Sequence, residues 1–324
     1  MIAPLPPGYR FDTPTAADRD EIAALIATAQ HADTGASDMT PEVLEDDWLG
    51  IELAEQAVLV RDASGRAVAY ADLFNRHYVM VSVYGVVHPD CRGRSLGQRL
   101  IEWGEHWTRD RMDRAEPGVR IVVQHYVNQK NQPAQVLLTS SGYDPVREYY
   151  EMVVDLDGMP PAPAWPTGIV PRPFRLGVDD DAAFKANEEA FRAIWGRPPG
   201  TKATFRNLVD TPKHDPGLWT LAWDGDQIAG QSWAHVVGGE GWIGVVGVRR
   251  PWRGRGLGLA LLQAAFVSFA ERGVVRVGLS VDAASATGAP RLYARAGMRV
   301  KNAFDLYRRE LRPGDDPFSR MAPD

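Results

Sequence analysis

The stretch WIGVVGVRRPWRGRGLGLALLQAAFVSFAERG, residues 242–273, decides the fold of the second half of the chain. Its apolar residues up to Val248 predict a strand, and an apolar stripe over residues 259–272 predicts a helix. The glycine-rich turn RGRGLG, residues 253–258, joins the two. The first amides of a helix lack partners inside the helix and carry partial positive charge. A strand, a glycine turn and a helix in this order therefore predict a cradle for a diphosphate.

The chain carries these signals twice. VVHPDCRGRSLGQRLIEW at 86–103 matches GVRRPWRGRGLGLALLQA at 247–264. Residues 57–74 and 218–236 both predict a β-hairpin, because two apolar runs flank a short turn with Gly and Asp. Each repeat also starts with a predicted helix and ends with a short helix and two closing strands. The same elements in the same order indicate a duplicated domain.

The duplication and a proline-rich stretch between the copies set the predicted domains. We expect an N-terminal domain at 1–157, a stiff linker at 158–173 and a C-terminal domain at 174–324, because the dense prolines cannot continue a helix or a central strand. Strands and helices in this order predict an α+β fold, with a mixed, mostly antiparallel sheet and helices on its faces.

Composition excludes several classes of protein. The chain has 324 residues, 44% of them apolar, and a net charge of −6, which argues against a nucleic-acid partner. Its single cysteine, Cys91, rules out an internal disulfide and fits a reducing cytoplasm. Neither a signal peptide nor an apolar run long enough for a membrane is expected, and the oligomeric state stays open.

Two separate motifs resemble the GNAT superfamily of acyltransferases. The pattern R-x-x-G-x-G is filled by Arg253, Gly256 and Gly258, and the short-helix pattern Ala-x-x-Leu-Tyr-x-x-x-Gly-Phe is filled from Ala289, with methionine in place of phenylalanine. The resemblance recurs in both repeats, so together they cover nearly the whole chain. Such a tandem arrangement is similar to the mycothiol synthase group.

The resemblance implies that acetyl-CoA is the cosubstrate, wedged between the fourth and fifth strands of a splayed sheet, and that no metal is needed. It implies that Tyr293 protonates the leaving thiolate while an amine attacks directly. In the second repeat the expected acetyl-CoA contacts are Val246, Val248, Arg253, Gly254, Arg255, Gly256, Leu257 and Gly258. In the first repeat they are Val87, Arg92, Gly93, Arg94, Ser95, Gly97 and Asn131.

The attacking amine also needs a base. Glu240, just before the fourth strand, is the first candidate, although a solvated turn carboxylate is an equal alternative. His235 is the second candidate, and a lone histidine on a strand is more often structural. Tyr293 could also be an aromatic residue of the core, but its motif favours the catalytic role.

The two repeats have diverged at these positions. Leu138 stands where the second repeat has Tyr293, and a leucine cannot donate a proton. Ser95 replaces the middle glycine of the turn, whereas Asn131 keeps a family contact that the second repeat has lost to Ala286. We therefore expect a catalytic C-terminal domain and a degenerate N-terminal one.

Three functions remain open at the level of the sequence. The favoured one is an N-acetyltransferase that acts on a small-molecule amine. A peptide or protein N-acetyltransferase and an acyl-CoA sensor without turnover are the alternatives. The acceptor pocket could be lined by Glu188, Glu189, Trp195 and Arg197, although carboxylates on a helix face are usually just solvated.

Overall fold

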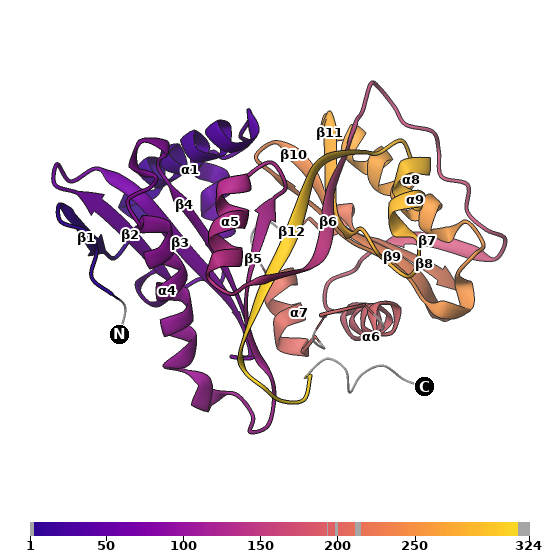
Figure 1. Cartoon of the computed structure of the whole chain (residues 1–324). Helices are drawn as coiled ribbons and strands as arrows, with labels where there is room; N and C mark the ends of the chain where they lie inside the picture. The colour runs from indigo at the N-terminus through magenta and orange to yellow at the C-terminus, as the bar shows by residue number, and fades with distance from the viewer. Residues whose placement is uncertain (1–2, 193, 198–199, 211–214, 317–324) are drawn as a thin grey trace. The chain divides into compact units, whose positions relative to one another are not determined.

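The computed structural model describes residues 3–192, 194–197, 200–210 and 215–316. Contacts divide these residues into two compact units. Unit 1 holds the described residues up to Glu148 together with those from Ala303 onward, and unit 2 holds those from Tyr149 to Asn302. In Figure 1 unit 1 runs mainly from indigo to magenta and unit 2 mainly from pink to orange. No helix of the described residues is long and apolar enough to cross a membrane.

Unit 1 is a sheet with helices on both faces. Its strands lie in the order β1-β2-β3-β4-β5-β12, and only β4 and β5 run parallel. The helix α1 contacts β3 and β4, and α4 packs on the other face, where a Cβ on Gly85 would lie 3.6 Å from Leu100. Its elements are β1 Tyr9–Asp12, α1 Arg19–Thr34, α2 Pro41–Asp47, α3 Leu53–Gln56, β2 Ala57–Asp62, β3 Ala67–Arg76, β4 Met80–Val87, α4 Leu96–Arg109, β5 Ile121–Asn128 and α5 Gln132–Ser140.

Unit 2 repeats this plan. Its strands lie in the order β6-β11-β10-β9-β8-β7, and only β10 and β11 run parallel. Its elements are β7 Ile169–Pro173, α6 Asp180–Phe191, α7 Lys202–Val209, β8 Thr220–Asp224, β9 Gln227–Val237, β10 Glu240–Val248, α8 Leu257–Ala270, β11 Arg276–Asp282 and α9 Ala289–Arg295. The two mostly antiparallel sheets confirm the predicted α+β class.

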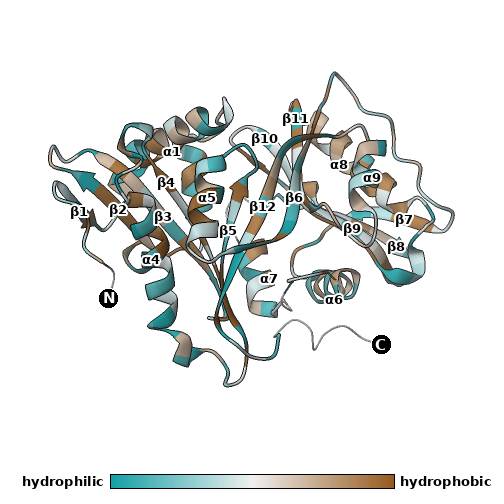
Figure 2. Ribbon diagram, in the orientation of Figure 1, coloured by the Kyte–Doolittle hydropathy of each residue, from teal (hydrophilic) through white to brown (hydrophobic). Residues whose placement is uncertain are grey.

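The helices of the units bury apolar faces against their sheets. Along α4, Figure 2 shows hydrophobic and hydrophilic residues side by side, and its buried apolar residues include Leu96, Leu100 and Trp107. In unit 2 the core includes Leu262, Phe266 and Phe269 of α8. Burial of such side chains is the main stabilising term of folding.

The closing strands are exchanged between the repeats. The strand β12, Arg299–Arg312, comes from the second repeat, yet it pairs antiparallel with β5 of unit 1 from Phe304 onward. The strand β6, Asp144–Asp155, comes from the first repeat, and its residues from Tyr149 pair with β11 of unit 2. The two compact units therefore divide the chain within these strands, between Glu148 and Tyr149 and between Asn302 and Ala303.

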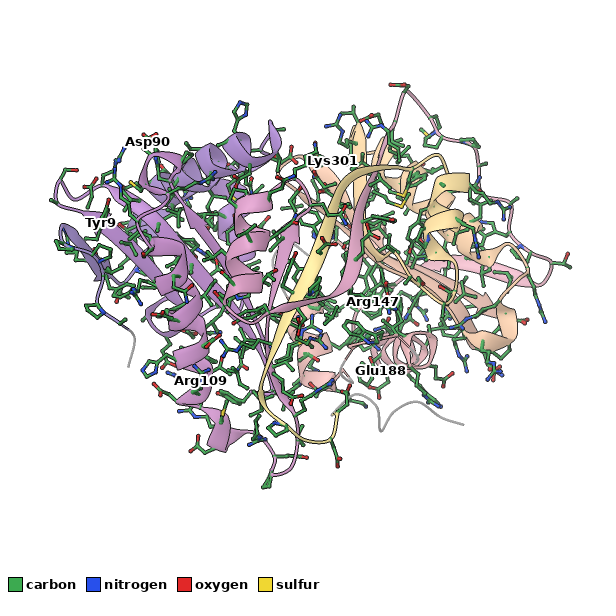
Figure 3. All side chains as sticks on the ribbon, in the orientation of Figure 1. Tyr9, Asp90, Arg109, Arg147, Glu188 and Lys301 are labelled. Atoms are coloured by element: carbon green, nitrogen blue, oxygen red, sulfur yellow. The ribbon has the colours of Figure 1, made fainter. Side chains whose placement is uncertain are left out.

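The exchange places Arg309 of β12 beside buried Glu105 of α4. The guanidinium lies 2.8 Å from the Glu105 carboxylate, which also contacts Arg109 at 2.9 Å and accepts a hydrogen bond from the Tyr143 hydroxyl at 3.1 Å. Arg109 is labelled in Figure 3 at the end of α4. A carboxylate that is 5% exposed thus owes one of its two arginines to the second repeat.

The predicted linker also contains a strand. Residues 169–173 form β7, which pairs with β8 at the edge of the sheet of unit 2. Proline lacks the amide hydrogen that a central strand must donate, so it is tolerated at an edge. This position explains how Pro171 and Pro173 fit into a strand.

Candidate active site

The glycine-rich turn of unit 2 has the geometry that its sequence predicts. Gly254 has φ of 75°, and Gly256 precedes α8 with φ of 86° and ψ of −4°. Both lie in the left-handed region, which glycine enters without a Cβ penalty. The amides of Leu259 and Ala260 donate to the Gly256 carbonyl at 3.1 Å each. Within the described residues, the amides from Arg255 to Gly258 have no backbone acceptor, so they remain open to an anion.

The two parallel strands next to this turn, β10 and β11, diverge. The strands β10 and β11 pair only at Gly241–Val277 and Trp242–Gly278, although β10 continues to Val248. In unit 1, β4 and β5 pair only from Met80–Val122 to Ser82–Gln124. In unit 2 the backbone groups of β10 that face β11 beyond Trp242 are not paired with that strand. An extended ligand with amide groups could therefore pair with Val246 and Val248, as expected for the pantetheine arm.

A β-bulge in β10 distinguishes unit 2 from unit 1. The pairing of β10 with β9 shifts between Ile243 and Val245, so Gly244 has no partner residue on β9. The pairing of β4 with β3 in unit 1 runs without a shift. A bulge turns the backbone groups of the extra residue away from the ladder. Unit 2 thus has a backbone group free for a ligand at a point where unit 1 has a regular ladder.

Tyr293 lies on α9, and α9 packs against the start of α8. A Cβ on Gly258 would lie 2.9 Å from Leu292 Cδ2, so the glycine lets the turn and the Tyr293 helix approach closely. Tyr293 is 8% exposed, and burial raises the pKa of its phenol to about 12. Its hydroxyl has no hydrogen-bond partner within the described residues and carries its proton at neutral pH.

The guanidinium of Arg253 binds backbone carbonyls of unit 2. Its guanidinium donates to the Val248 carbonyl and to the Ala190 carbonyl, both at 2.9 Å, and so ties the end of β10 to α6. Arg249 forms an ion pair with Glu189 at 2.6 Å. Arg250 and Arg255 are exposed and have no partner within the described residues, so they are the two guanidinium groups left for phosphates.

The two expected bases differ in their surroundings. Glu240 begins β10, at the end where β10 pairs with β11. Its exposed carboxylate lies 3.5 Å from Arg276 Nη1. His235 on β9 is the cross-strand partner of Trp242, the last residue of β10 that pairs with β11. Burial lowers the pKa of His235, so its imidazole is neutral and can accept a proton at neutral pH.

Three of the four side chains expected around the acceptor, those of Glu188, Glu189 and Arg197, form ion pairs. Glu188 of α6, labelled in Figure 3, lies 2.5 Å from Arg197 Nη2 and accepts a hydrogen bond from the Gly200 amide at 2.9 Å. With Glu189 held by Arg249, both carboxylates stabilise this region of unit 2.

In unit 1 the carboxylate of Asp33 contacts one residue that follows β4 and one that follows β5, the two strands that diverge. Asp33 of α1 lies 2.8 Å from Arg92 Nη1 and accepts a hydrogen bond from the Asn131 side chain at 2.8 Å. Arg92 belongs to the turn after β4, and Asn131 caps α5, which follows β5. Both side chains therefore share one carboxylate partner in unit 1.

The rest of the first turn keeps its shape with different residues. Gly93 has φ of 73°, and Ser95 precedes α4 with φ of 61°, so a serine adopts the left-handed conformation that Gly256 has in unit 2. Arg94 donates to the Tyr9 hydroxyl at 2.6 Å. A Cβ on Gly97 would lie 2.8 Å from Leu137, and the next residue, Leu138, is buried. Val87 ends β4.

Sequence reasoning missed Gly244, Asp33 and the role of Gly258 as a spacer. A glycine inside a strand is a known signal for a bulge, and WIGVVGV contains one at 244. Asp33 left no signal, because its two partners are 59 and 98 residues away along the chain.

Known proteins resemble this chain along its length. The model of the "Acetyltransferase (GNAT) family" matches residues 23–143 and 181–298. A mycothiol acetyltransferase of Catenulispora acidiphila is 31% identical over 229 residues, which are 68% of this chain and 70% of the relative. A mycothiol acetyltransferase of Streptomyces bingchenggensis is 31% identical over 317 residues, which are 92% of this chain and 94% of the relative.

Two solved structures share the fold. A GCN5-related N-acetyltransferase from Sphaerobacter thermophilus has a TM-score of 0.89 and 48% identity, and the match covers 97% of this chain and 99% of that one. A tandem GNAT protein from the clavulanic acid biosynthesis pathway has a TM-score of 0.70 and 19% identity, and the match covers 95% of this chain and 100% of that one. The second likeness concerns the fold alone.

Proposed function

Because the chain belongs to the GNAT family of acetyl-CoA-dependent acetyltransferases, we propose that unit 2 transfers the acetyl group to a primary amine of a small molecule. The observation that carries the proposal is the unpartnered hydroxyl of Tyr293, a residue that is 8% exposed on a helix packed against the glycine turn. Unit 1 has buried Leu138 at that place and a regular ladder where unit 2 has its bulge. Relatives named for mycothiol support a small-molecule acceptor.

The residues of unit 2 suit the expected cosubstrate. The open amides from Arg255 to Gly258 would hold the diphosphate of acetyl-CoA, and Arg250 and Arg255 would neutralise its charge. The stretch of β10 that does not pair with β11 would bind the pantetheine arm at Val246 and at the Val248 amide, because the Val248 carbonyl already accepts a hydrogen bond from Arg253. Acetyl-CoA supplies a thioester, whose carbonyl carbon accepts the amine.

Proton transfer completes the reaction. The amine nitrogen forms a bond to the carbonyl carbon as the carbon–sulfur bond breaks, and the electron pair leaves on sulfur. Tyr293 is protonated at neutral pH and donates to the thiolate, whose conjugate thiol has a pKa of about 8.5. The proton lost by the amine goes to a base.

Of the two candidates for that base, His235 has the better position. His235 lies opposite Trp242, the last residue of β10 that pairs with β11, and its imidazole is neutral. Glu240, in contrast, is exposed and forms an ion pair with Arg276. Replacing His235 by glutamine should remove the acidic limb of the kcat/KM profile, measured from pH 5 to 9. If the limb persists in H235Q but disappears in E240Q, Glu240 is the base.

The assignment to unit 2 can be tested with matched variants. Tyr293→Phe should lower kcat by about 10² or more while calorimetry shows unchanged acetyl-CoA affinity, because only the proton donor is lost. Arg255→Glu should raise the KM for acetyl-CoA, whereas the equivalent change in unit 1, Arg94→Glu, should leave turnover unchanged. Thiol release with a panel of small amines is the assay. A silent Tyr293→Phe, or loss of turnover only in Arg94→Glu, would show that unit 2 is not the active unit.

A further inference from the structure

A histidine lies at the point where the two parallel strands of unit 1 diverge. His125 of β5 follows Gln124, which forms the last pair of β5 with β4. Its imidazole forms a hydrogen bond with the backbone of Val83 on β4. Within the described residues His125 Nε2 has no hydrogen-bond partner, so this bond comes from Nδ1. A side chain of one strand is therefore bonded to the backbone of the other just beyond their last pair.

The ring of His125 is neutral and donates this hydrogen bond. Burial lowers the pKa of His125 to about 4, so at neutral pH the ring has a single N–H, which lies on Nδ1 and points to the Val83 carbonyl. His125 is 8% exposed, and its ring meets the ring of Tyr143 edge to face with centroids 5.0 Å apart. Nε2 is then a buried acceptor without a donor, which costs free energy.

The imidazole takes a carbonyl that the strand ladder would otherwise use. The Val122 amide donates to the Val79 carbonyl at 3.0 Å, and a parallel ladder repeats this bond every two residues. If the pairing continued, the amide of Tyr126 would reach the Val83 carbonyl. The pairing ends before that point, and the side chain of His125 replaces the next backbone bond.

The fold does not require a histidine at this place. In unit 2 the residue after the last pair of β11 with β10 is Leu279, which is 1% exposed and belongs to the apolar core. A leucine cannot donate to a carbonyl. It also buries no unsatisfied nitrogen, so it is the less costly residue for this position. The hydrogen bond of His125 is therefore a property of unit 1 and not of the shared architecture.

The position of Val83 corresponds to the acyl end of the proposed pantetheine arm. In unit 2 the arm would run along β10 from the Val248 amide to Val246, toward the end where β10 pairs with β11. The thioester at its tip would then lie near Gly244, four residues before the last residue of β10. Four residues before Val87, the last residue of β4, is Val83.

We propose that His125 excludes acetyl-CoA from unit 1, because it bonds β5 to β4 where the thioester would enter and places its ring beside Val83. The chain then binds one molecule of acetyl-CoA, and the contacts expected with it in the first repeat do not form. The inference rests on the proposed function of unit 2. Binding stoichiometry, measured without an acceptor and without turnover, tests the two separately.

Calorimetric titration of the full chain with acetyl-CoA gives the number of molecules bound. The wild-type protein should bind one, and His125→Leu, which introduces the residue of unit 2, should bind two. The second molecule should persist when Arg255→Glu is added and disappear when Arg94→Glu is added, because these changes affect different turns. The control His106→Leu removes a partly exposed imidazole of α4 and should leave one molecule bound.

Two results would overturn the role of His125. They are two molecules bound by the wild-type protein, and one molecule bound by a folded His125→Leu protein. If His125→Leu shows no cooperative unfolding transition, His125→Met takes its place, because the flexible methionine side chain adapts to the site and cannot donate to the carbonyl. No binding of acetyl-CoA by the wild-type protein, or a single molecule lost in Arg94→Glu but not in Arg255→Glu, would instead refute the proposed function of unit 2.

Discussion

Replacing Asp72 by asparagine should abolish a pH dependence of the free energy of unfolding that the wild-type protein has. Burial raises the pKa of Asp72 from 3.8 to about 7 in the folded chain. The folded state therefore holds this proton more tightly than the unfolded state does. The resulting stability is fully present below pH 3.8 and is lost as the pH rises through 7.

The size of the effect follows from the shift. One pKa unit corresponds to about 1.4 kcal/mol, so the complete loss amounts to roughly 4 kcal/mol. Between pH 5 and pH 8 the wild-type protein should lose about 2–3 kcal/mol of this, because part of the loss occurs below pH 5. Asparagine has no proton to lose, so the Asp72→Asn protein should lack this component.

Urea unfolding at pH 5 and pH 8, followed by tryptophan fluorescence, gives the free energies. The informative quantity is the difference between wild type and Asp72→Asn at each pH, since other titrating groups cancel. The control is Asp113→Asn, which changes an exposed carboxylate of unit 1 by the same chemistry. Parallel pH profiles of wild type and Asp72→Asn would refute the raised pKa.

Two further substitutions test the packing described above. Arg309→Met should lower the stability of unit 1 by on the order of 2–3 kcal/mol in urea unfolding, because buried Glu105 loses one of its cations; a change below about 0.5 kcal/mol would contradict this. Gly247→Ala should cost about 1–3 kcal/mol by the same assay, because its Cβ would lie 2.7 Å from Phe191, whereas Gly244→Ala, with 3.9 Å to its nearest atom, is the matched control. Equal stability of the two alanine proteins would disprove the contact between β10 and α6.

The glycine-rich turn and the duplication could be predicted because their signals are local. A left-handed residue ahead of a helix favours glycine, and the glycines of the turn, Gly254 and Gly256, supply that signal in the sequence. The exchange of closing strands could not be predicted. The two closing strands alternate in the same way, and alternation determines which face of a strand is buried but not which sheet the strand joins.

The bulge was hidden for a related reason. Three glycines, Gly241, Gly244 and Gly247, interrupt the strand β10, and each gives the same signal in the sequence. The structure separates them, because Cβ atoms on Gly241 and Gly247 would collide with Phe269 and Phe191, whereas Gly244 has space and no partner on β9. Two of the glycines serve helix packing, and one serves the bulge.

The divergence of the two units is concentrated on positions that the fold does not need. The backbone pairing between β3 and β4 is indifferent to whether its side chains are Asp72 and Tyr84, as the pair Trp233–Val245 in unit 2 demonstrates. Unit 2 kept the phenol of Tyr293 and filled the other face with aromatic rings, and unit 1 lost the phenol but carries a buried, uncompensated carboxylate. A copy that had merely decayed would have been free to replace this costly group. Its presence gives unit 1 the pH-dependent stability that the Asp72→Asn protein is expected to lack.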